Sequence, residues 1–251
     1  LNKNTTASQN TALGNQTLNA NTTGANNTAV GACSLYTNTT ASSNTAVGFS
    51  SLVANTTGAN NVSVGTNALD SNTTGEGNVA VGVQALDANV SGYGNTAMGK
   101  QALCKNTAND NTAIGGAALC LNTSGANNTA VGKTALVANT TGAGNTAVGH
   151  QAMMTTTTEG QNVAVGKDSM RLNSTGGNNV AVGVNSLCTN TTASANTAVG
   201  TYSVRDNTTG ACNTGIGYAA LRVNTTGAGN TAVGNNTLDL NTTGANNVAV
   251  G

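Results

Sequence analysis

The chain repeats itself every seventeen residues, and a glycine closes each copy, usually within the sequence AVG. Successive copies of this glycine are seventeen residues apart except between Gly99 and Gly115, where the step is sixteen. A short fixed period over a whole chain is typical of repeat proteins in which each unit contacts only its neighbours. We therefore expect residues 1–251 to form one repeat domain with a single shortened coil at residues 100–115. Because the sequence begins within a repeat and shows no polar capping unit, we expect it to be a segment of a longer fibre.

The three residues before this glycine alternate in size. The residue directly before it is always large and aliphatic, the next one back is Ala except at Ser63 and Gly215, and the third is Thr or Val. A period of two is typical of a β-strand with two unlike faces. We predict that the large aliphatic residue faces the core. The alanine has two interpretations, a second layer inside the coil or a surface that another chain approaches closely.

A second apolar column stands four residues after each glycine and includes Leu52, Leu69 and Leu86. Two short apolar pieces per repeat cannot make an amphipathic helix, which needs apolar residues about every 3.6 positions. They suit one coil of a parallel β-solenoid, in which like residues stack about 4.8 Å apart. We predict an all-β parallel solenoid of about fifteen coils, with both large apolar columns buried. Glycines of the NTTG turns are expected to take positive φ, as at Gly24, Gly58, Gly75, Gly142 and Gly210.

An asparagine column is the sharpest feature of the turns. Thirteen turns contain an Asn-X-Ser/Thr sequon, and its third residue is Ser or Thr in every coil except at Ala108. Two interpretations are open: N-glycosylation of an extracellular fibre, or an asparagine turn whose hydroxyl bonds its own backbone. In both, we expect the column to lie on an exposed edge, because the slot also accepts Thr156 and the shortened Asn106 segment. The candidate glycosylation sites are Asn4, Asn21, Asn38, Asn55, Asn72, Asn89, Asn122, Asn139, Asn173, Asn190, Asn207, Asn224 and Asn241.

Five cysteines cannot all pair within one chain. Cys104 and Cys120 occupy the same slot in adjacent coils, and a stacking distance of about 4.8 Å lies within the range that a disulfide allows. A bridge between them and two exposed thiols are both open interpretations. Cys33, Cys188 and Cys212 have no neighbour in the same slot, so we expect them to be free.

The composition argues against several classes of function. Charged residues make up 6% of the chain and the formal net charge is zero, which leaves no electrostatic basis for binding nucleic acid or an anionic membrane surface. The sequence has no apolar run long enough to span a membrane, so we expect no membrane insertion. The few charges are interpreted as a solvent-facing edge five residues after the repeat glycine, at Asp70, Asp87, Arg171, Arg205, Arg222 and Asp239.

No group of residues has the spacing of a catalytic or metal site. His150 is the only histidine and lies in a variable slot without partners to orient it. The glycines follow the turn period, and neither a phosphate-binding loop nor a calcium-binding roll repeat is present. We therefore predict that the chain is not an enzyme and has no catalytic, cofactor-binding or metal-binding residues. The aromatic residues occupy scattered slots, which predicts no stacking platform, at Tyr36, Phe49, Tyr93, Tyr202 and Tyr218.

The strand segment NNVAVG at Asn178–Gly183 and the NTAVG segments elsewhere resemble the NSVAIG core of the head repeats of trimeric autotransporter adhesins. NTAVGxxALxxNTTG arrays are also similar to repeats of phage tail-fibre proteins. The resemblance covers the whole chain, although the coil is longer than that of the adhesins and no neck, stalk or anchor is present. It implies a left-handed parallel β-roll, often trimeric, that serves adhesion on a cell or virion surface.

Two classes of function follow. The favoured one is a structural, non-enzymatic repeat of an extracellular or surface fibre whose partner is a further copy of itself, with glycans on the sequons. The alternative is an adhesin or receptor-binding fibre module that binds host-surface glycans or receptors. Ice binding is a weaker alternative, because the adjacent Thr140 and Thr141 would point to opposite faces of a strand. A binding module is expected to show a broken repeat or an exposed aromatic cluster, and the sequence shows neither.

Overall fold

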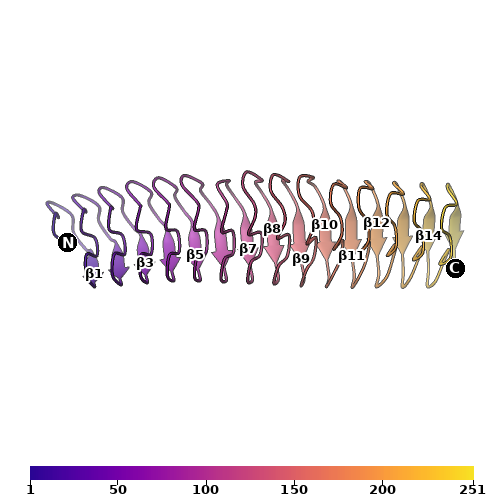
Figure 1. Ribbon diagram of the computed structural model, residues 1–251, viewed down its shortest axis with the longest axis horizontal. Coiled ribbons are helices and arrows are strands. Elements are labelled where there is room, and N and C mark those ends of the chain that lie inside the picture. Colours follow the sequence, from indigo (N-terminus) through magenta and orange to yellow (C-terminus); the bar gives the residue numbers. More distant parts are fainter. The chain divides into compact units, whose positions relative to one another are not determined.

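The computed structural model describes all residues 1–251, which form strands and turns and no helix. The chain divides into two compact units, Leu1–Ala126 and Asn127–Gly251. In each unit the strands lie side by side and turn segments complete every coil (Figure 1). The predicted all-β parallel solenoid is confirmed.

Each coil contributes one strand of three residues. Unit 1 contains β1 (Thr11–Leu13), β2 (Thr28–Val30), β3 (Thr45–Val47), β4 (Val62–Val64), β5 (Val79–Val81), β6 (Thr96–Met98) and β7 (Thr112–Ile114). Unit 2 contains β8 (Thr129–Val131), β9 (Thr146–Val148), β10 (Val163–Val165), β11 (Val180–Val182), β12 (Thr197–Val199), β13 (Thr214–Ile216), β14 (Thr231–Val233) and β15 (Val248–Val250).

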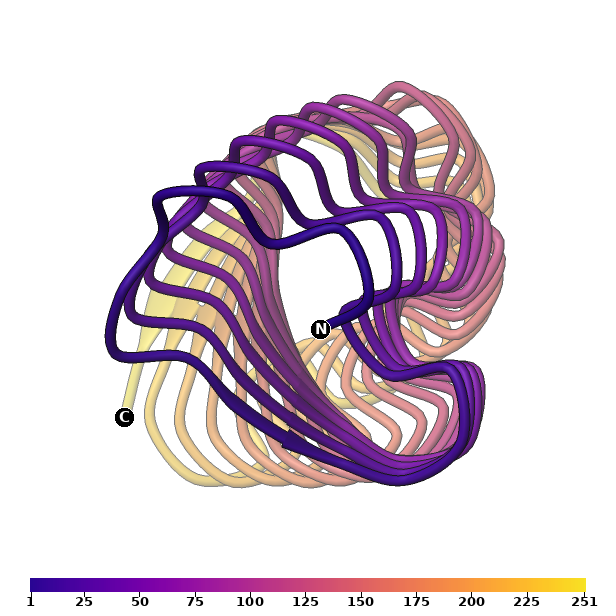
Figure 2. The same cartoon turned by 90° about the vertical axis from the view of Figure 1, so that its left-hand side faces the viewer.

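The repeat sets the register of the sheet in each unit. Within each unit, every strand pairs in parallel with the next strand along the chain, so that Ala29 lies opposite Ala46 and Ala164 opposite Ala181. The sixteen-residue step keeps this register, because Thr96 still pairs with Thr112. The shortened coil therefore has one residue fewer in a turn, and its strand is unchanged. Seen from the N-terminal end of unit 1, the chain runs anticlockwise as it recedes (Figure 2), which makes the coil left-handed.

The strand faces are the reverse of those predicted. The middle residue of each strand points inward, and Ala29, Ala46 and Ala80 are fully buried. The aliphatic residue before the glycine points outward and is half-buried at Val47 and 42% exposed at Met98. The prediction of a buried Val47, Val64 and Val81 column is wrong, and the alanine forms the second layer inside the coil.

The narrow interior explains this orientation. At Gly215, which replaces the strand alanine, an added Cβ would lie 2.5 Å from Cγ2 of Val204. Val204 replaces leucine in the same coil, so its β-branch occupies the space that the alanine methyl fills elsewhere. Since the wall facing the strand leaves room for about one methyl group, a larger side chain in the middle of the strand would clash.

The leucine column is buried as predicted, and Leu52, Leu69 and Leu86 are fully enclosed. These leucines take left-handed backbone angles, with φ of 53° at Leu52 and 50° at Leu69. Such a conformation costs roughly 1–2 kcal/mol per residue. Burial of a leucine side chain contributes about 1.5–3 kcal/mol, which offsets the cost in each coil.

Glycine occupies two turn positions for different reasons, at the end of each repeat and, in most coils, at the end of the NTTG turn. Gly48 has a φ of 136°, and a Cβ there would lie 2.6 Å from the carbonyl oxygen of Gly65 in the next coil. The NTTG glycines do not take positive φ, so the prediction for Gly24, Gly58, Gly75, Gly142 and Gly210 is wrong. A side chain at Gly58 would instead overlap the carbonyl oxygen of Gly75. Close stacking of successive backbones favours a small residue there, and Ala7, Ala41 and Ala193 occupy the same slot in other coils.

The two apolar columns should respond differently to truncation. Leu86→Ala leaves a cavity in the core and should lower the free energy of unfolding by about 2–5 kcal/mol. Val81→Ala removes an outward side chain and should cost less than about 1 kcal/mol in the isolated chain. Urea unfolding followed by circular dichroism measures both variants. Equal losses would contradict the orientation of the strand.

Candidate functional surfaces

The asparagines of the sequon column form a hydrogen-bond ladder inside the coil, which we call the first Asn ladder and which is interrupted beside the two irregular coils. The side-chain nitrogen of Asn55 donates to Oδ1 of Asn38 at 2.9 Å and to the carbonyl oxygen of Gly58 at 2.9 Å. Its own Oδ1 accepts from Nδ2 of Asn72 at 2.9 Å. Both N–H groups and the oxygen of Asn55 are therefore bonded, so its burial leaves no polar group unsatisfied.

A second Asn ladder lies directly before the strands and was not predicted. Nδ2 of Asn44 donates to the carbonyl oxygen of Gly58 at 2.9 Å, and the backbone N–H of Asn44 donates to Oδ1 of Asn27 at 3.0 Å. The carbonyl of Gly58 thus accepts from both ladders. An asparagine before every strand was the sequence signal for this ladder.

The expected exposed edge of asparagines is wrong. Eleven of the thirteen candidate glycosylation sites are fully buried, and the other two, Asn4 and Asn241, lie in the terminal coils. A sugar on Nδ2 would replace a bonded N–H and would need space that the packed interior does not have. In the folded chain, the buried sites are Asn21, Asn38, Asn55, Asn72, Asn89, Asn122, Asn139, Asn173, Asn190, Asn207 and Asn224.

The two irregular coils show how the first Asn ladder tolerates change. In the shortened coil, Nδ2 of Asn106 turns to the carbonyl oxygen of Ala108 at 2.8 Å, and Oδ1 of Asn89 is left without a partner. Thr156 replaces asparagine in another coil, and its hydroxyl donates to the carbonyl oxygen of Asn173 at 3.0 Å. A buried slot accepts Thr156 because the hydroxyl also finds a partner.

The outer face of the strands carries two columns that we call the sheet stripe. The first residue of every strand is Thr or Val, and the third is Val, Ile, Leu or Met. Their side chains are half-buried or exposed in both units. No charged residue occurs among these positions, so each unit displays an apolar surface that repeats from coil to coil. Exposed apolar patches of this kind mark interaction surfaces.

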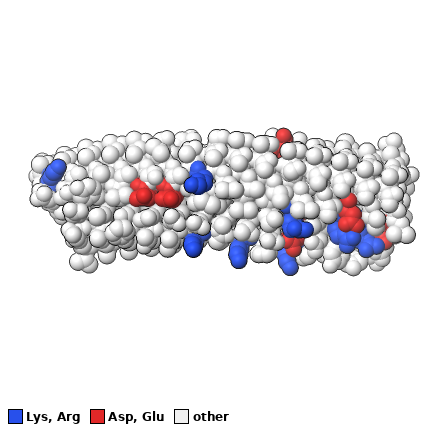
Figure 3. Space-filling model, viewed as in Figure 1, with Lys and Arg blue, Asp and Glu red and all other residues white.

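Charged residues are few and scattered on the face shown in Figure 3. The column five residues after the repeat glycine is half-buried rather than fully solvent-facing. Burial raises the pKa of Asp70, and burial together with the charge of Asp70 raises the pKa of Asp87. Arg222 and Asp239 form a two-pronged ion pair at 2.7 and 3.0 Å, which lowers the pKa of Asp239.

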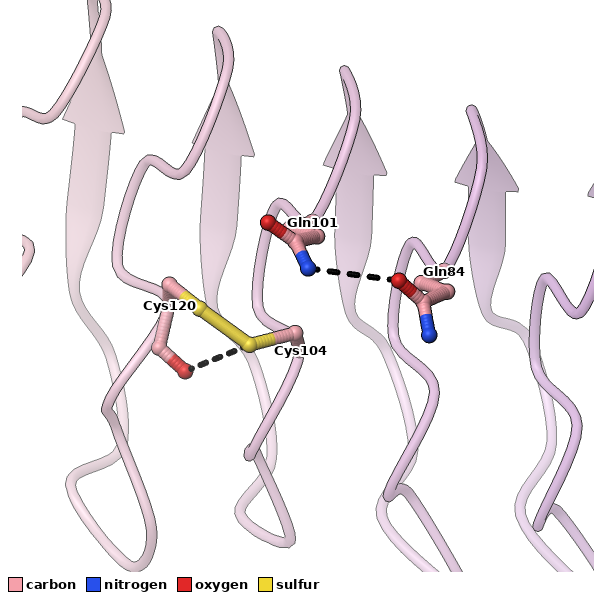
Figure 4. Close-up of a disulfide and its surroundings, with 4 residues drawn as sticks. All are labelled: Gln84, Gln101, Cys104 and Cys120. Carbon is pink, nitrogen blue, oxygen red and sulfur yellow. Dashed lines mark hydrogen bonds between the residues drawn. A yellow bond between two sulfur atoms is a disulfide. The ribbon is translucent and has the colours of Figure 1, made fainter.

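Cys104 and Cys120 are joined by a disulfide between adjacent coils, with Cα atoms 4.8 Å apart (Figure 4). The bridged sulfur of Cys104 lies 3.3 Å from the carbonyl oxygen of Cys120, a contact without a hydrogen because the sulfur has no proton. The bridge closes the shortened coil, and a loop of this length contributes roughly 3 kcal/mol in the chain-entropy account. The remaining cysteines are free: Cys33, Cys188 and Cys212.

One aromatic cluster contradicts the expected scatter. The rings of Tyr202 and Tyr218 meet edge to face with centroids 5.9 Å apart, and the guanidinium carbon of Arg205 lies 5.7 Å from the Tyr202 centroid. Arg205 also makes a two-pronged pair with Asp206 at 2.7 Å. Tyr218 is 53% exposed. The two tyrosines occupy different slots of adjacent coils, so a search for equal slots does not find them.

The surface has no pocket, and no three His, Cys, Asp or Glu side chains come together. His150 is exposed. The distinctive features are therefore the sheet stripe, the disulfide edge and the Tyr202 cluster. No family model and no curated protein matches the chain.

The first Asn ladder should be sensitive to single truncations. Asn55→Ala orphans Oδ1 of Asn38 and an N–H of Asn72, and each unsatisfied buried group costs about 1–3 kcal/mol. We expect a loss of about 2–6 kcal/mol in the free energy of unfolding. The control is Thr57→Ala in the same turn, which is exposed, breaks no hydrogen bond and should change stability by about 0.5 kcal/mol or less. Equal urea midpoints for the two variants would refute the ladder.

Proposed function

We propose that the chain is a non-enzymatic structural segment of an extracellular, cell-surface or virion-surface fibre in which solenoids associate side by side through the sheet stripe. One observation carries the proposal: the outward strand positions stay apolar or threonine in every coil although they face solvent. The fold itself does not require this, because a solvent-facing strand position accepts polar side chains.

A second copy of the same chain is the partner that the stripe fits best. Its side chains recur at the coil spacing of about 4.8 Å, and only a surface with the same period can pack against many coils at once. Another solenoid has that period. The absence of charge on the stripe removes the repulsion that would keep two identical surfaces apart.

The disulfide supports a location outside the reducing cytosol. Structural disulfides persist mainly in oxidising environments, and the Cys104–Cys120 bridge joins the shortened coil to the next coil within unit 1. This agrees with the surface location that the resemblance to adhesin heads and tail fibres implies. A surface without a pocket is also typical of a structural repeat rather than of an enzyme.

A second candidate function is receptor or glycan binding by the Tyr202 cluster. Tyr218 is exposed and Tyr202 is half-buried, and aromatic rings beside paired charges are side chains that protein surfaces use to hold a ligand by stacking and hydrogen bonds. The rings of Tyr202 and Tyr218 are in contact, and Arg205 lies over the Tyr202 ring. The Tyr202 cluster favours an adhesin module in which the repeats give the fibre its length and this cluster binds the ligand.

Charges on the sheet stripe should separate the copies without unfolding them. The triple variant Val47→Glu, Val64→Glu, Val81→Glu places three like charges on the outer strand face, so it should be monomeric with an unchanged circular dichroism spectrum. Light scattering after size exclusion measures the mass of both proteins.

The matched control places three glutamates in the variable slot after the repeat glycine, as Thr66→Glu, Val83→Glu and Lys100→Glu. This control should associate as the wild type does. A wild-type chain that is monomeric at every concentration, or a stripe variant that still associates, would contradict the proposal.

A further inference from the structure

The second residue after each ladder asparagine forms a column that we call the hydroxyl column. It is exposed in every coil that has it, and no hydrogen bond involves its hydroxyl. Its only interruption is Ala108, in the shortened coil, where the turn has one residue fewer. The column consists of Thr6, Thr23, Thr40, Thr57, Thr74, Ser91, Ser124, Thr141, Thr158, Thr175, Thr192, Thr209, Thr226 and Thr243.

A comparison of the repeats shows that this column retains a hydroxyl group, whereas it does not retain the β-branched shape of threonine. At the first strand position, Thr exchanges freely with Val, as at Val62 and Val79, so a β-branched shape suffices there. In the hydroxyl column of the full-length turns, Thr exchanges only with Ser, at Ser91 and Ser124, and never with Val. The oxygen is therefore the retained feature.

The fold does not use this oxygen. The preceding residue is threonine in most turns and does bond the next coil, as Thr22 Oγ1 donates to the carbonyl oxygen of Thr39 at 3.0 Å. Thr23 beside it is exposed, and its hydroxyl has no partner in the chain. Other exposed slots vary widely, and the slot after the repeat glycine holds Phe49, Lys100 and His150.

N-glycosylation does not explain the column either. A sequon needs both the asparagine and the hydroxyl, yet the asparagine side chains are buried and bonded. The coil with Thr156 in place of asparagine has no sequon at that turn, and it still keeps Thr158 in the hydroxyl column. The hydroxyl is thus retained independently of the asparagine two residues before it.

We propose that the hydroxyl column is an array of O-linked glycosylation sites that carry small neutral sugars. The three requirements of such a site are a Ser or Thr oxygen, exposure and freedom from other bonds, and the column meets all three. In the transfer, Oγ attacks the anomeric carbon of a nucleotide-activated sugar and its proton passes to a base of the transferase. The new C–O bond forms as the bond from the anomeric carbon to the diphosphate breaks, and the nucleoside diphosphate leaves.

Charge and spacing select a small neutral group. The segments from the ladder asparagine to the next strand contain no Lys or Arg in any coil, and their charges are Glu76, Asp110 and Glu159. Phosphates repeated at each coil would repel one another without a cation to compensate them. Adjacent coils are 4.8 Å apart at Cys104 and Cys120, so neighbouring sites have room for single sugars and not for branched glycans.

Mass spectrometry of the chain from its native host tests this proposal. We expect repeated additions of one sugar mass, located by electron-transfer fragmentation on the hydroxyl column, released by alkaline β-elimination and resistant to N-glycosidase. Thr57→Val expressed in the same host should lose the sugar at that site, whereas Thr56→Val should keep the sugar on Thr57. Both variants should keep the wild-type circular dichroism spectrum.

A bare polypeptide mass would overturn the proposal, as would sugars on the asparagines or on the Thr22 and Thr56 column. A Thr57→Val chain with an unchanged sugar mass and an assigned site elsewhere would overturn it as well. The result is separate from side-by-side association. A chain that associates through the sheet stripe and carries no sugar leaves the structural proposal standing and removes this one.

Discussion

Hydrogen bonds between buried asparagine side chains hold each coil to the next, and the other features of the structure depend on them. An unpaired amide in an apolar interior is costly, yet most coils bury two asparagine side chains. The cost is avoided because the repeat places the same amide one coil further on, where Asn55 donates to Asn38 and accepts from Asn72. A shorter turn breaks the chain of bonds, because Nδ2 of Asn106 turns to the carbonyl oxygen of Ala108 and leaves Oδ1 of Asn89 without a partner.

A core made of amides needs little apolar volume, and this decides which side chains reach the surface. One leucine or similar residue per coil and the strand alanine are enclosed, and the interior has no space for a second large side chain. Strands nevertheless favour β-branched residues, so Thr and Val of the strands point outward. The sheet stripe is therefore a consequence of the narrow interior, and its period equals that of the coil. The same stacking repeats the hydroxyl column along the turns.

The sequence predicts the period, the parallel strands, the leucine column and the slot shared by Cys104 and Cys120. It did not predict which strand face is buried, because alternation of large and small residues looks the same from either side. The decisive signal is the tolerance of each column. Ala, Ser63 and Gly215 are all small, as a confined site requires, whereas Leu13, Met98 and Ile114 differ in branching and shape, as an open site allows. The predicted exposure of the Asn column is wrong because a buried slot also accepts Thr156, whose hydroxyl donates to the carbonyl oxygen of Asn173 inside the coil. The Tyr202 cluster joins different slots, which a comparison of equal positions does not detect.

Hydrogen exchange of the asparagine side-chain amides, measured by nuclear magnetic resonance on selectively labelled protein, tests the central claim most directly. Asn55 and Asn60 lie in the same turn, and the structure buries the first in the ladder and exposes the second. We expect the two Nδ2 protons of Asn55 to exchange only when its coil opens, whereas those of Asn60 exchange at the rate of a free amide. Equally fast exchange at Asn55 and Asn60 would show that the asparagines do not form the core of the coil.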